Sequence, residues 1–246
     1  MECYQKGLIT RKETEGLALT YGNHEALVVL LERIAYRVGF GDILAEGVRK
    51  TAKKIGKNSE KLAVHVKGLE PPGYDPRGLK GVALAYSVSC GGACHLRHTA
   101  YRPNLTGSLP FGQGKVDRLS YEGQARMVKE QEDFYSIVDS MVLCKFLCLP
   151  TIGPILWKEL ENLYQIITGI TVRKEDLVAT ASRITNVVTA FNKREGVGRK
   201  DNALPKRFMS QNLKIGASSG EIVETENFQK MLKEYYKLRN QGKLSQ

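Results

Sequence analysis

The stretch SYEGQARMVKEQEDFYSIVDSMVLCKF, residues 120–146, decides the fold class of this chain. Its apolar residues recur at three- and four-residue spacing, which places them on one face of an α-helix with polar residues opposite. We predict one long helix over 120–146, closed by Pro150 because proline cannot continue a helix. The residues available for its core face are Ala125, Val128, Phe134, Ile137, Val138 and Met141.

The same helical period extends in both directions from this stretch. Asn23 is a suitable N-cap before one helix, and Gly39 a suitable stop after it. Thr171 is a second candidate N-cap, followed by the acidic first turn Glu175-Asp176 that a helix N-terminus favours. The helices predicted outside 120–146 cover about 23–38, 42–56, 154–168, 171–194 and 226–239. The chain is therefore predicted to be mainly α.

Two other segments break this pattern. Residues 61–67 alternate apolar and other side chains, which predicts a short strand-like link, and Pro71-Pro72-Gly73 marks the best internal boundary. Residues 196–220 are rich in loop-forming residues. No repeat of fixed period and no convincing sheet is predicted.

Composition excludes several classes of protein. The chain has 246 residues, 42% of them hydrophobic and 26% charged, which argues against disorder and against a coiled-coil rod. Its 37 basic and 26 acidic residues give a net charge of +11, but the basic residues are scattered, so we expect no nucleic-acid partner. The longest apolar run, 26–31, is too short to span a bilayer, and the polar N-terminus does not resemble a signal peptide. We expect a cytoplasmic protein without membrane contact.

The segment SCGGACHLRH, residues 89–98, holds the densest set of reactive side chains. Gly91-Gly92 allows a tight turn and close approach to a ligand, and on a helix His95 and His98 would share a face. Cysteine and histidine are zinc ligands, and the two Cys-x3-Cys pairs are Cys90 with Cys94 and Cys144 with Cys148. A zinc-binding helical module and plain burial of these thiols are both open interpretations.

A second candidate lies in Asp139-Ser140-Met141-Val142-Leu143-Cys144. A carboxylate within an apolar helix is costly unless hydrogen-bond donors meet it. Those donors can come from the protein or from a ligand rich in N–H groups.

Several motifs, in order, resemble the aldehyde:ferredoxin oxidoreductases, and the resemblance covers essentially the whole chain. The motifs are Met1-Glu2-x-Tyr4-x-Lys6-Gly7, Tyr74-Asp75-Pro76-Arg77-Gly78, Gly92-Ala93-Cys94-His95, Asp139-x-x-x-Leu143-Cys144, Asp201-x-x-Leu204-Pro205-Lys206-Arg207-Phe208 and Tyr235-Tyr236-Lys237-Leu238-Arg239. The resemblance implies the multihelical C-terminal domains of that family, with 1–65 ending a middle domain and 66–246 forming the last one.

The resemblance also implies roles for five residues. It implies that Asp139, Leu143 and Arg97 contact a tungsten (or molybdenum) bis-pterin cofactor, and that His95 lies beside the metal as a catalytic group. It implies that Cys144 is one ligand of a [4Fe–4S] cluster, which needs four. The activity it implies is oxidation of small aldehydes to carboxylic acids, with electrons passing through the cluster to ferredoxin.

Members of the family are about twice as long, and their other cluster cysteines and active-site glutamate lie upstream of the part matched here. We therefore expect this chain to be the C-terminal portion, to be inactive alone, and to gain both cofactors only with an N-terminal pterin-binding half; a homodimer is compatible with this. Val142 and Gly91 stand where the family has glycine and commonly arginine. These departures keep a second reading open, a relative of the benzoyl-CoA reductase catalytic subunits.

Overall fold

The computed structural model describes residues 1–109, 111, 114–148 and 155–239. Within these ranges the chain is helical, without any strand, and its only β-type pairings are two isolated bridges, Val66 with Leu69 and Ser108 with Lys115. The prediction of a mainly α protein is confirmed. No helix in the described ranges is long and apolar enough to cross a membrane.

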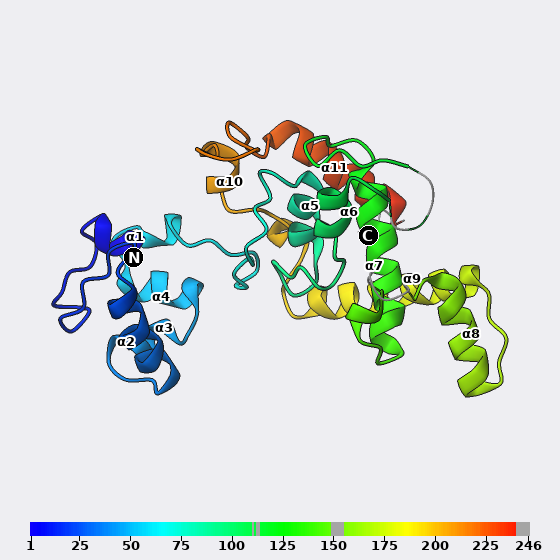
Figure 1. The fold of residues 1–246 in the computed structure, drawn as a ribbon, viewed down its shortest axis with the longest axis horizontal. Helices are drawn as coiled ribbons and strands as arrows, with labels where there is room; N and C mark the ends of the chain where they lie inside the picture. The colour runs from blue at the N-terminus through cyan, green and yellow to red at the C-terminus, as the bar shows by residue number, and fades with distance from the viewer. Residues whose placement is uncertain (110, 112–113, 149–154, 240–246) are drawn as a thin grey trace.

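The helices follow one another along the chain as shown in Figure 1. The α-helices are α1 (Glu2–Gln5), α2 (His24–Ala35), α3 (Phe40–Leu44), α4 (Val48–Ile55), α5 (Lys80–Val88), α6 (Tyr101–Thr106), α7 (Gln124–Ser140), α8 (Trp157–Thr168), α9 (Lys174–Arg194), α10 (Arg207–Ser210) and α11 (Thr225–Leu238). The 3-10 turns are η1 (Ser59–Lys61), η2 (Lys145–Cys148) and η4 (Arg199–Asp201).

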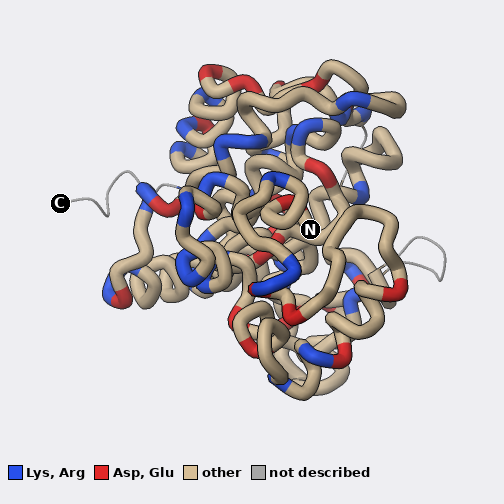
Figure 2. The backbone as a smooth tube through the Cα atoms, turned by 90° about the vertical axis from the view of Figure 1, so that its left-hand side faces the viewer, with Lys and Arg blue, Asp and Glu red and all other residues tan. Residues whose placement is uncertain are grey.

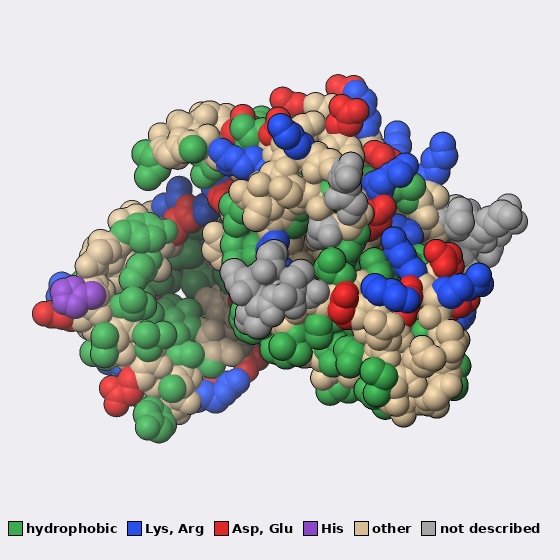
Figure 3. Space-filling model, turned by 45° about the vertical axis from the view of Figure 1, so that its right-hand side comes forward, with side chains coloured by type: hydrophobic (Ala, Val, Ile, Leu, Met, Phe, Trp, Pro, Cys, Tyr) green, Lys and Arg blue, Asp and Glu red, His purple; other side chains and the backbone are tan. Residues whose placement is uncertain are grey.

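The N-terminal lobe consists of α1 to α4 and lies on one side of an extended link (Figure 1). It has an apolar cluster of its own, made of Ile9, Leu19, Ala26, Leu30 and Phe40. Hydrophobic side chains also gather on the outer surface of this lobe (Figure 3). On α2 the side chains of Val28 and Leu31 are exposed, so the apolar stripe of this helix is only partly covered.

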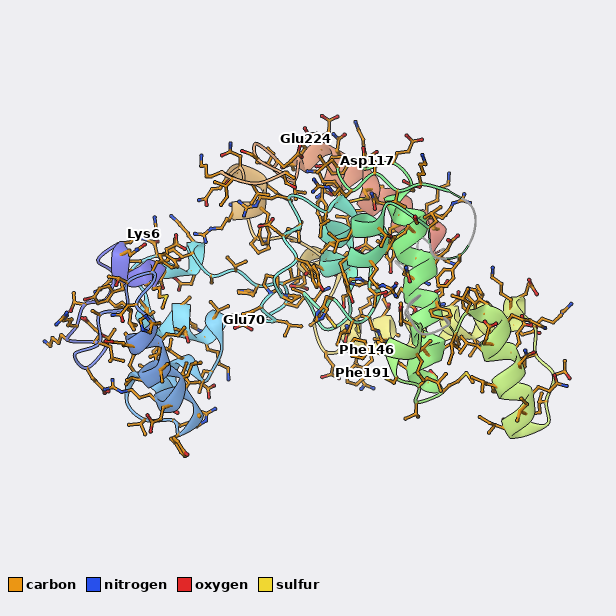
Figure 4. The ribbon with its side chains drawn as sticks, in the orientation of Figure 1. Lys6, Glu70, Asp117, Phe146, Phe191 and Glu224 are labelled. Carbon is orange, nitrogen blue, oxygen red and sulfur yellow. The ribbon has the colours of Figure 1, made fainter. Side chains whose placement is uncertain are left out.

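The C-terminal lobe is built around α7. Twelve of the seventeen residues of this helix are buried, because α5, α9 and α11 all pack against it. Two apolar clusters result, one around α5 and α11 and one around the second half of α7 with α8 and α9. Glu70 lies in the link between the lobes (Figure 4), where its carboxylate accepts a hydrogen bond from Val48 N at 2.5 Å. The boundary at residue 65 stays a prediction.

Basic and acidic residues are interspersed over the backbone in the view of Figure 2. An ion pair joins the lobes, in which Arg207 Nη2 of α10 lies 2.6 Å from Glu2 Oε1 of α1. Lys80 is buried at the start of α5, where its ammonium group donates to the carboxylate of Glu221. These contacts couple distant segments of the chain.

Several predicted boundaries are wrong for local reasons. The predicted stop at Gly39 is wrong, because α2 ends at Ala35 and Gly39, with φ +54°, is the N-cap of α3. The helix expected over 42–56 is two helices, since Gly47 takes φ +82° between α3 and α4. The helix expected over 120–146 begins at Gln124 and ends at Ser140. The N-cap of α9 is Arg173 rather than Thr171, with the predicted Asp176 carboxylate accepting from Arg173 N. The link at 61–67 has one bridge and no strand. The predicted stop at Pro150 and start at 154 lie outside the described residues.

Other predicted boundaries are confirmed. The side chain of Asn23 accepts a hydrogen bond from Ala26 N and caps α2 as predicted. The last helix, α11, matches the predicted 226–239 within one residue at either end. These ends are set by local chemistry that is visible in the sequence.

Candidate functional site

The candidate site lies at the C-terminal end of α7, where the chain turns sharply. Helix α7 stops at Ser140 because Val142 adopts a left-handed conformation, φ +57°, which ends the helical hydrogen bonding. Leu143 N then donates to Val138 O at 3.0 Å, which closes the turn. The side chain of Leu143 packs against the apolar cluster of α7, α8 and α9, whereas Cys144 is exposed. The turn therefore presents a thiol directly after the helix end.

Asp139 occupies the last turn of α7 and is met by two cations. Lys145 Nζ lies 2.9 Å from Asp139 Oδ1 and donates to Oδ2 at 3.0 Å. Arg97 Nη1 lies 3.6 Å from the same Oδ2. The donors that this carboxylate requires thus come at least partly from the protein, and its side chain keeps 34% exposure, which leaves it accessible to a ligand.

Lys145 was not predicted as a site residue, yet it holds the site together. Besides pairing with Asp139, its ammonium donates to Leu96 O at 2.8 Å and lies 5.4 Å from the ring centroid of Tyr135. It therefore joins the 89–98 segment to the end of α7. No helical spacing relates Lys145 to Asp139, because the chain reverses between them, so periodicity had no means of pairing the two.

His95 lies in the 89–98 segment beside two tyrosines. Its ring centroid is 5.7 Å from that of Tyr74 and 5.9 Å from that of Tyr101, and the two tyrosine rings stack at 4.2 Å. Burial, and then the positive charge of Lys145, lower the pKa of His95 below its ordinary value. The imidazole is therefore neutral at pH 7 and can accept a proton.

His98 does not share a helical face with His95, contrary to expectation, because residues 91–100 form turns rather than a helix. Its side chain is 1% exposed, and its Nδ1 accepts a hydrogen bond from Ala100 N at 3.1 Å. Burial lowers the pKa of His98 to about 3. His98 is a neutral residue of the core, whereas His95 lies at the candidate site.

In the Gly91-Gly92 bend, the second glycine lies directly against the backbone of another segment. Gly92 has φ +104°, and a Cβ there would lie 2.1 Å from Val66 O. Only glycine fits this contact, which packs the 89–98 segment onto the link between the lobes. At Gly91, which is exposed, a Cβ would meet nothing within 4 Å. The close approach that we expected toward a ligand is made at Gly92 toward the protein.

The four paired cysteines do not assemble into a zinc site. Cys90 lines a cavity of about 200 Å³ with Lys67 and Asn192, whereas Cys148 is buried at a different cavity with Arg102. Burial raises the pKa of the Cys148 thiol to about 11. Nowhere in the described ranges do three His, Cys, Asp or Glu side chains come together as metal ligands. The geometry contradicts a four-thiolate module.

Residues 1–243 match the family model "Aldehyde ferredoxin oxidoreductase, domains 2 & 3". The chain belongs to this family. The resemblance inferred from the ordered motifs is thereby confirmed, as is its assignment to the domains that follow the first.

Named relatives agree with this membership. The chain is 34% identical over 241 residues to the tungsten-containing aldehyde ferredoxin oxidoreductase of Pyrococcus furiosus, covering 97% of the chain and 38% of the relative. It is 33% identical to the enzyme of the same name from Thermococcus kodakarensis, with the same coverage. An aliphatic sulfonate oxidoreductase, WOR-like subunit, of Pyrococcus furiosus is 30% identical over 247 residues, covering 96% of the chain and 35% of the relative. The chain therefore spans less than two fifths of the length of these relatives.

The fold is also shared with a solved structure. A chain of the active-site complex BamBC of benzoyl coenzyme A reductase, solved with 1,5-dienoyl-CoA, superposes with a TM-score of 0.73. The match covers 97% of this chain and 39% of that one, at 22% sequence identity. At this identity the comparison establishes the fold.

Proposed function

We propose that this chain supplies the C-terminal portion of a tungsten-pterin oxidoreductase that oxidises small aldehydes to carboxylic acids. The observation that carries the proposal is the convergence at the end of α7. Asp139, the exposed thiol of Cys144 and the segment bearing His95 meet there, and Lys145 joins them. Family membership and the named relatives support the same activity.

The residues around Asp139 suit the edge of a pterin. The carboxylate of Asp139, one-third exposed, can accept hydrogen bonds from N–H groups, and Arg97 and Lys145 add positive charge beside an anionic cofactor. In this proposal Leu143 contributes through its backbone carbonyl, since its N–H donates to Val138 O and its partly buried side chain packs against the apolar cluster of α7, α8 and α9. When bound, tungsten (or molybdenum) in its bis-pterin would supply the redox chemistry of aldehyde oxidation. The residues of this chain position that group and balance its charge.

Cys144 fits the role of one ligand to an iron–sulfur cluster. It is an exposed cysteine directly after α7, and thiolates are the ligands of [4Fe–4S] clusters. The described ranges hold no group of three metal-ligating side chains, and in this proposal the remaining three ligands come from outside this chain. We propose that the cluster passes electrons from the pterin site to ferredoxin.

His95 is proposed as the group that takes or gives a proton near the substrate. Its lowered pKa keeps the imidazole neutral at pH 7, so it can accept a proton from water or from a substrate oxygen. The stacked rings of Tyr74 and Tyr101 limit the positions of the imidazole and exclude water from one side. General acid–base groups of this kind contribute about 10²–10⁴-fold to rate.

The proposed partners follow from this division of labour. They are an N-terminal pterin-binding portion, ferredoxin as the electron acceptor and a small aldehyde as substrate; a homodimer of the assembled enzyme is compatible with them. In this proposal the chain alone is inactive.

The proposal is tested with a chimera in which the matched C-terminal part of the Pyrococcus furiosus relative is replaced by this chain. We expect the chimera to bind tungsten and to reduce a viologen dye with aldehydes, and the isolated chain to do neither. Benzoyl-CoA, offered with a strong reductant, tests the second reading. Aldehyde oxidation by the isolated chain would contradict the proposal, as would a tungsten-loaded chimera that acts only on benzoyl-CoA.

Variants of the chimera separate the proposed roles. Cys144→Ala should lower the iron content, whereas His95→Ala should retain iron and tungsten and lose about 10²–10⁴-fold in turnover. Cys94→Ala is the matched control, because this thiol is near His95 in sequence but has no proposed role. Equal loss of iron in the Cys144 and His95 variants would refute the division of roles.

A further inference from the structure

A second cavity lies behind the candidate site, within the C-terminal lobe. It has a volume of about 340 Å³ and is lined from α6, α7 and the residue before α8, elements labelled in Figure 1. Its walls are mostly apolar and aromatic, including Phe111, Phe134 and Leu156. Volumes of this size fall in the range of small-molecule pockets. The cavity therefore has room for a compact apolar body.

The guanidinium of Arg102 faces this cavity without a carboxylate partner. It donates from Nη1 to Cys148 O at 3.3 Å and also hydrogen-bonds the Tyr135 hydroxyl, so its described partners are neutral groups. Five other buried or half-buried arginines in the described ranges form ion pairs with Asp or Glu: Arg33, Arg77, Arg97, Arg207 and Arg239. Arg118, also half-buried, donates to Gly78 O, Ala217 O and Ser218 Oγ. Arg102 is the exception in another way, since its described side-chain partners, Cys148 O and the Tyr135 hydroxyl that lines the same cavity, are both neutral and no described carboxylate lies against it.

A buried amide lines the same cavity. Gln131 of α7 is 3% exposed and has no hydrogen bond to any described residue. Gln124 of the same helix differs, because it accepts from Asn104 and donates to Asp117 O and Ser120 O. An amide without a described partner and an arginine without a carboxylate line one apolar cavity, and a ligand with acceptor oxygens would pair with both of them.

We propose that this cavity binds an amphipathic monocarboxylate, an aromatic or branched-chain acid. The carboxylate would accept hydrogen bonds from Arg102 and from the amide of Gln131, and the apolar body would lie against Phe111 and Phe134. A neutral apolar ligand would leave the cation unpaired, and a small polar anion would leave the aromatic walls uncovered. The inference goes beyond the proposed function and rests on geometry that is independent of it.

The chain carries a probe beside this cavity. Trp157, its single tryptophan, packs against two lining rings, with centroids 6.0 Å from that of Phe111 and 5.2 Å from that of Phe134. The full chain is titrated with 3-phenylpropionate and, separately, with 3-phenylpropionamide and acetate, following Trp157 fluorescence and heat. We expect the acid to bind at least ~10-fold more tightly than either comparison compound, since a hydrogen-bonded charge contributes about that much.

Two variants and a control complete the test. Arg102→Gln should weaken binding of the acid ~10-fold or more and leave the amide unaffected, and Gln131→Leu should weaken it less. Arg126→Gln, an exposed arginine on α7, should change neither. Circular dichroism and the urea midpoint establish that each variant is folded. Equal binding of acid and amide, absence of binding at millimolar acid, or unchanged binding by folded Arg102→Gln would each overturn the proposal.

Discussion

The middle and the C-terminal end of α7 each carry a cluster of charged side chains, and the two clusters differ in solvent exposure. In the first cluster, on the middle of the helix, Glu132 and Asp133 pair with Arg239, the C-cap residue of α11. The side chains are only 2% to 7% exposed, and the hydroxyl of Tyr235 donates to Glu132 Oε2 at 2.6 Å. Burial by itself would lower the pKa of the Arg239 guanidinium. The carboxylates beside it have the larger combined effect, so the pKa is raised above its ordinary value. This cluster closes on itself.

The second cluster lies at the end of the same helix and remains open. Asp139 pairs with Lys145 and Arg97, but each of these side chains is between 23% and 34% exposed. Beyond it the chain turns, and Phe146 is exposed at this end of the lobe, as is Phe191 of α9 (Figure 4). The comparison shows that a carboxylate paired with a cation has two uses in this fold. Where the pair is buried it stabilises the fold, and where it is solvent-exposed the carboxylate stays accessible to a ligand.

The largest expected effect tests the closed cluster. Arg239→Met leaves the buried carboxylate of Glu132 without its cation and that of Asp133 with Lys129 alone, so we expect a loss of about 3–5 kcal/mol in the free energy of unfolding, measured by urea denaturation. Arg126→Met, an exposed arginine on α7, is the control and should cost about 0.5 kcal/mol or less. An equal loss of unfolding free energy in both variants would show that the buried cluster does not stabilise the fold more than an exposed arginine does.

A buried titratable group near the open cluster gives the next effect. The pKa of His98 is about 3 in the fold, below the ordinary value of 6.5, so between these pH values the unfolded chain binds more protons. Its contribution to stability is therefore complete above pH 6.5 and is lost as the pH falls toward 3. We expect the loss from this group between pH 6.5 and pH 5 to be about 2 kcal/mol.

The variant His98→Asn isolates this effect, because it removes the titration and keeps an acceptor for Ala100 N. Urea denaturation of both proteins across the pH range measures the difference in slope. If the free energy of unfolding depended on pH equally in the variant and the parent, His98 would not be held in its neutral form by burial.

A smaller effect comes from the turn beside the open cluster. Val142 is β-branched, left-handed and 90% exposed, so it bears backbone strain without gaining burial. We expect Val142→Gly to raise the free energy of unfolding by about 1 kcal/mol, the cost of a left-handed residue less the extra freedom of glycine in the unfolded chain. Val142→Ala keeps a Cβ and should gain less. Destabilisation by glycine would show that the turn is relaxed with valine.

The smallest effect on stability is expected at Asp139 itself. Asp139→Asn removes ion pairs that are about one-third exposed and screened by water, so the loss should be below about 1 kcal/mol. In the chimera described above, the same variant should lower the tungsten content. A loss of unfolding free energy as large as that of Arg239→Met would show that the ion pairs of Asp139 stabilise the fold as strongly as the buried ones. The two clusters would then not differ in their contribution to stability.

Much of the architecture was predictable because it depends on local periodicity. Helices such as α2 and α11 have a polar and an apolar face, and the cap at Asn23 is a local contact. Helix α5 escaped prediction, because eight of its nine residues are buried and it has no polar face to mark its period. The ends of α7 depend on how the following turn packs, which the spacing of residues does not record.

The sequence by itself determined the helical class, the order of the family motifs and the candidates His95, Arg97, Asp139, Leu143 and Cys144. Only the tertiary structure decided which of these side chains meet. It paired Lys145 with Asp139 across a reversal of the chain, and it separated the four paired cysteines that their spacing had grouped. The physical reason is that periodicity describes one element at a time, whereas a binding site is made where the ends of several elements are brought together by packing.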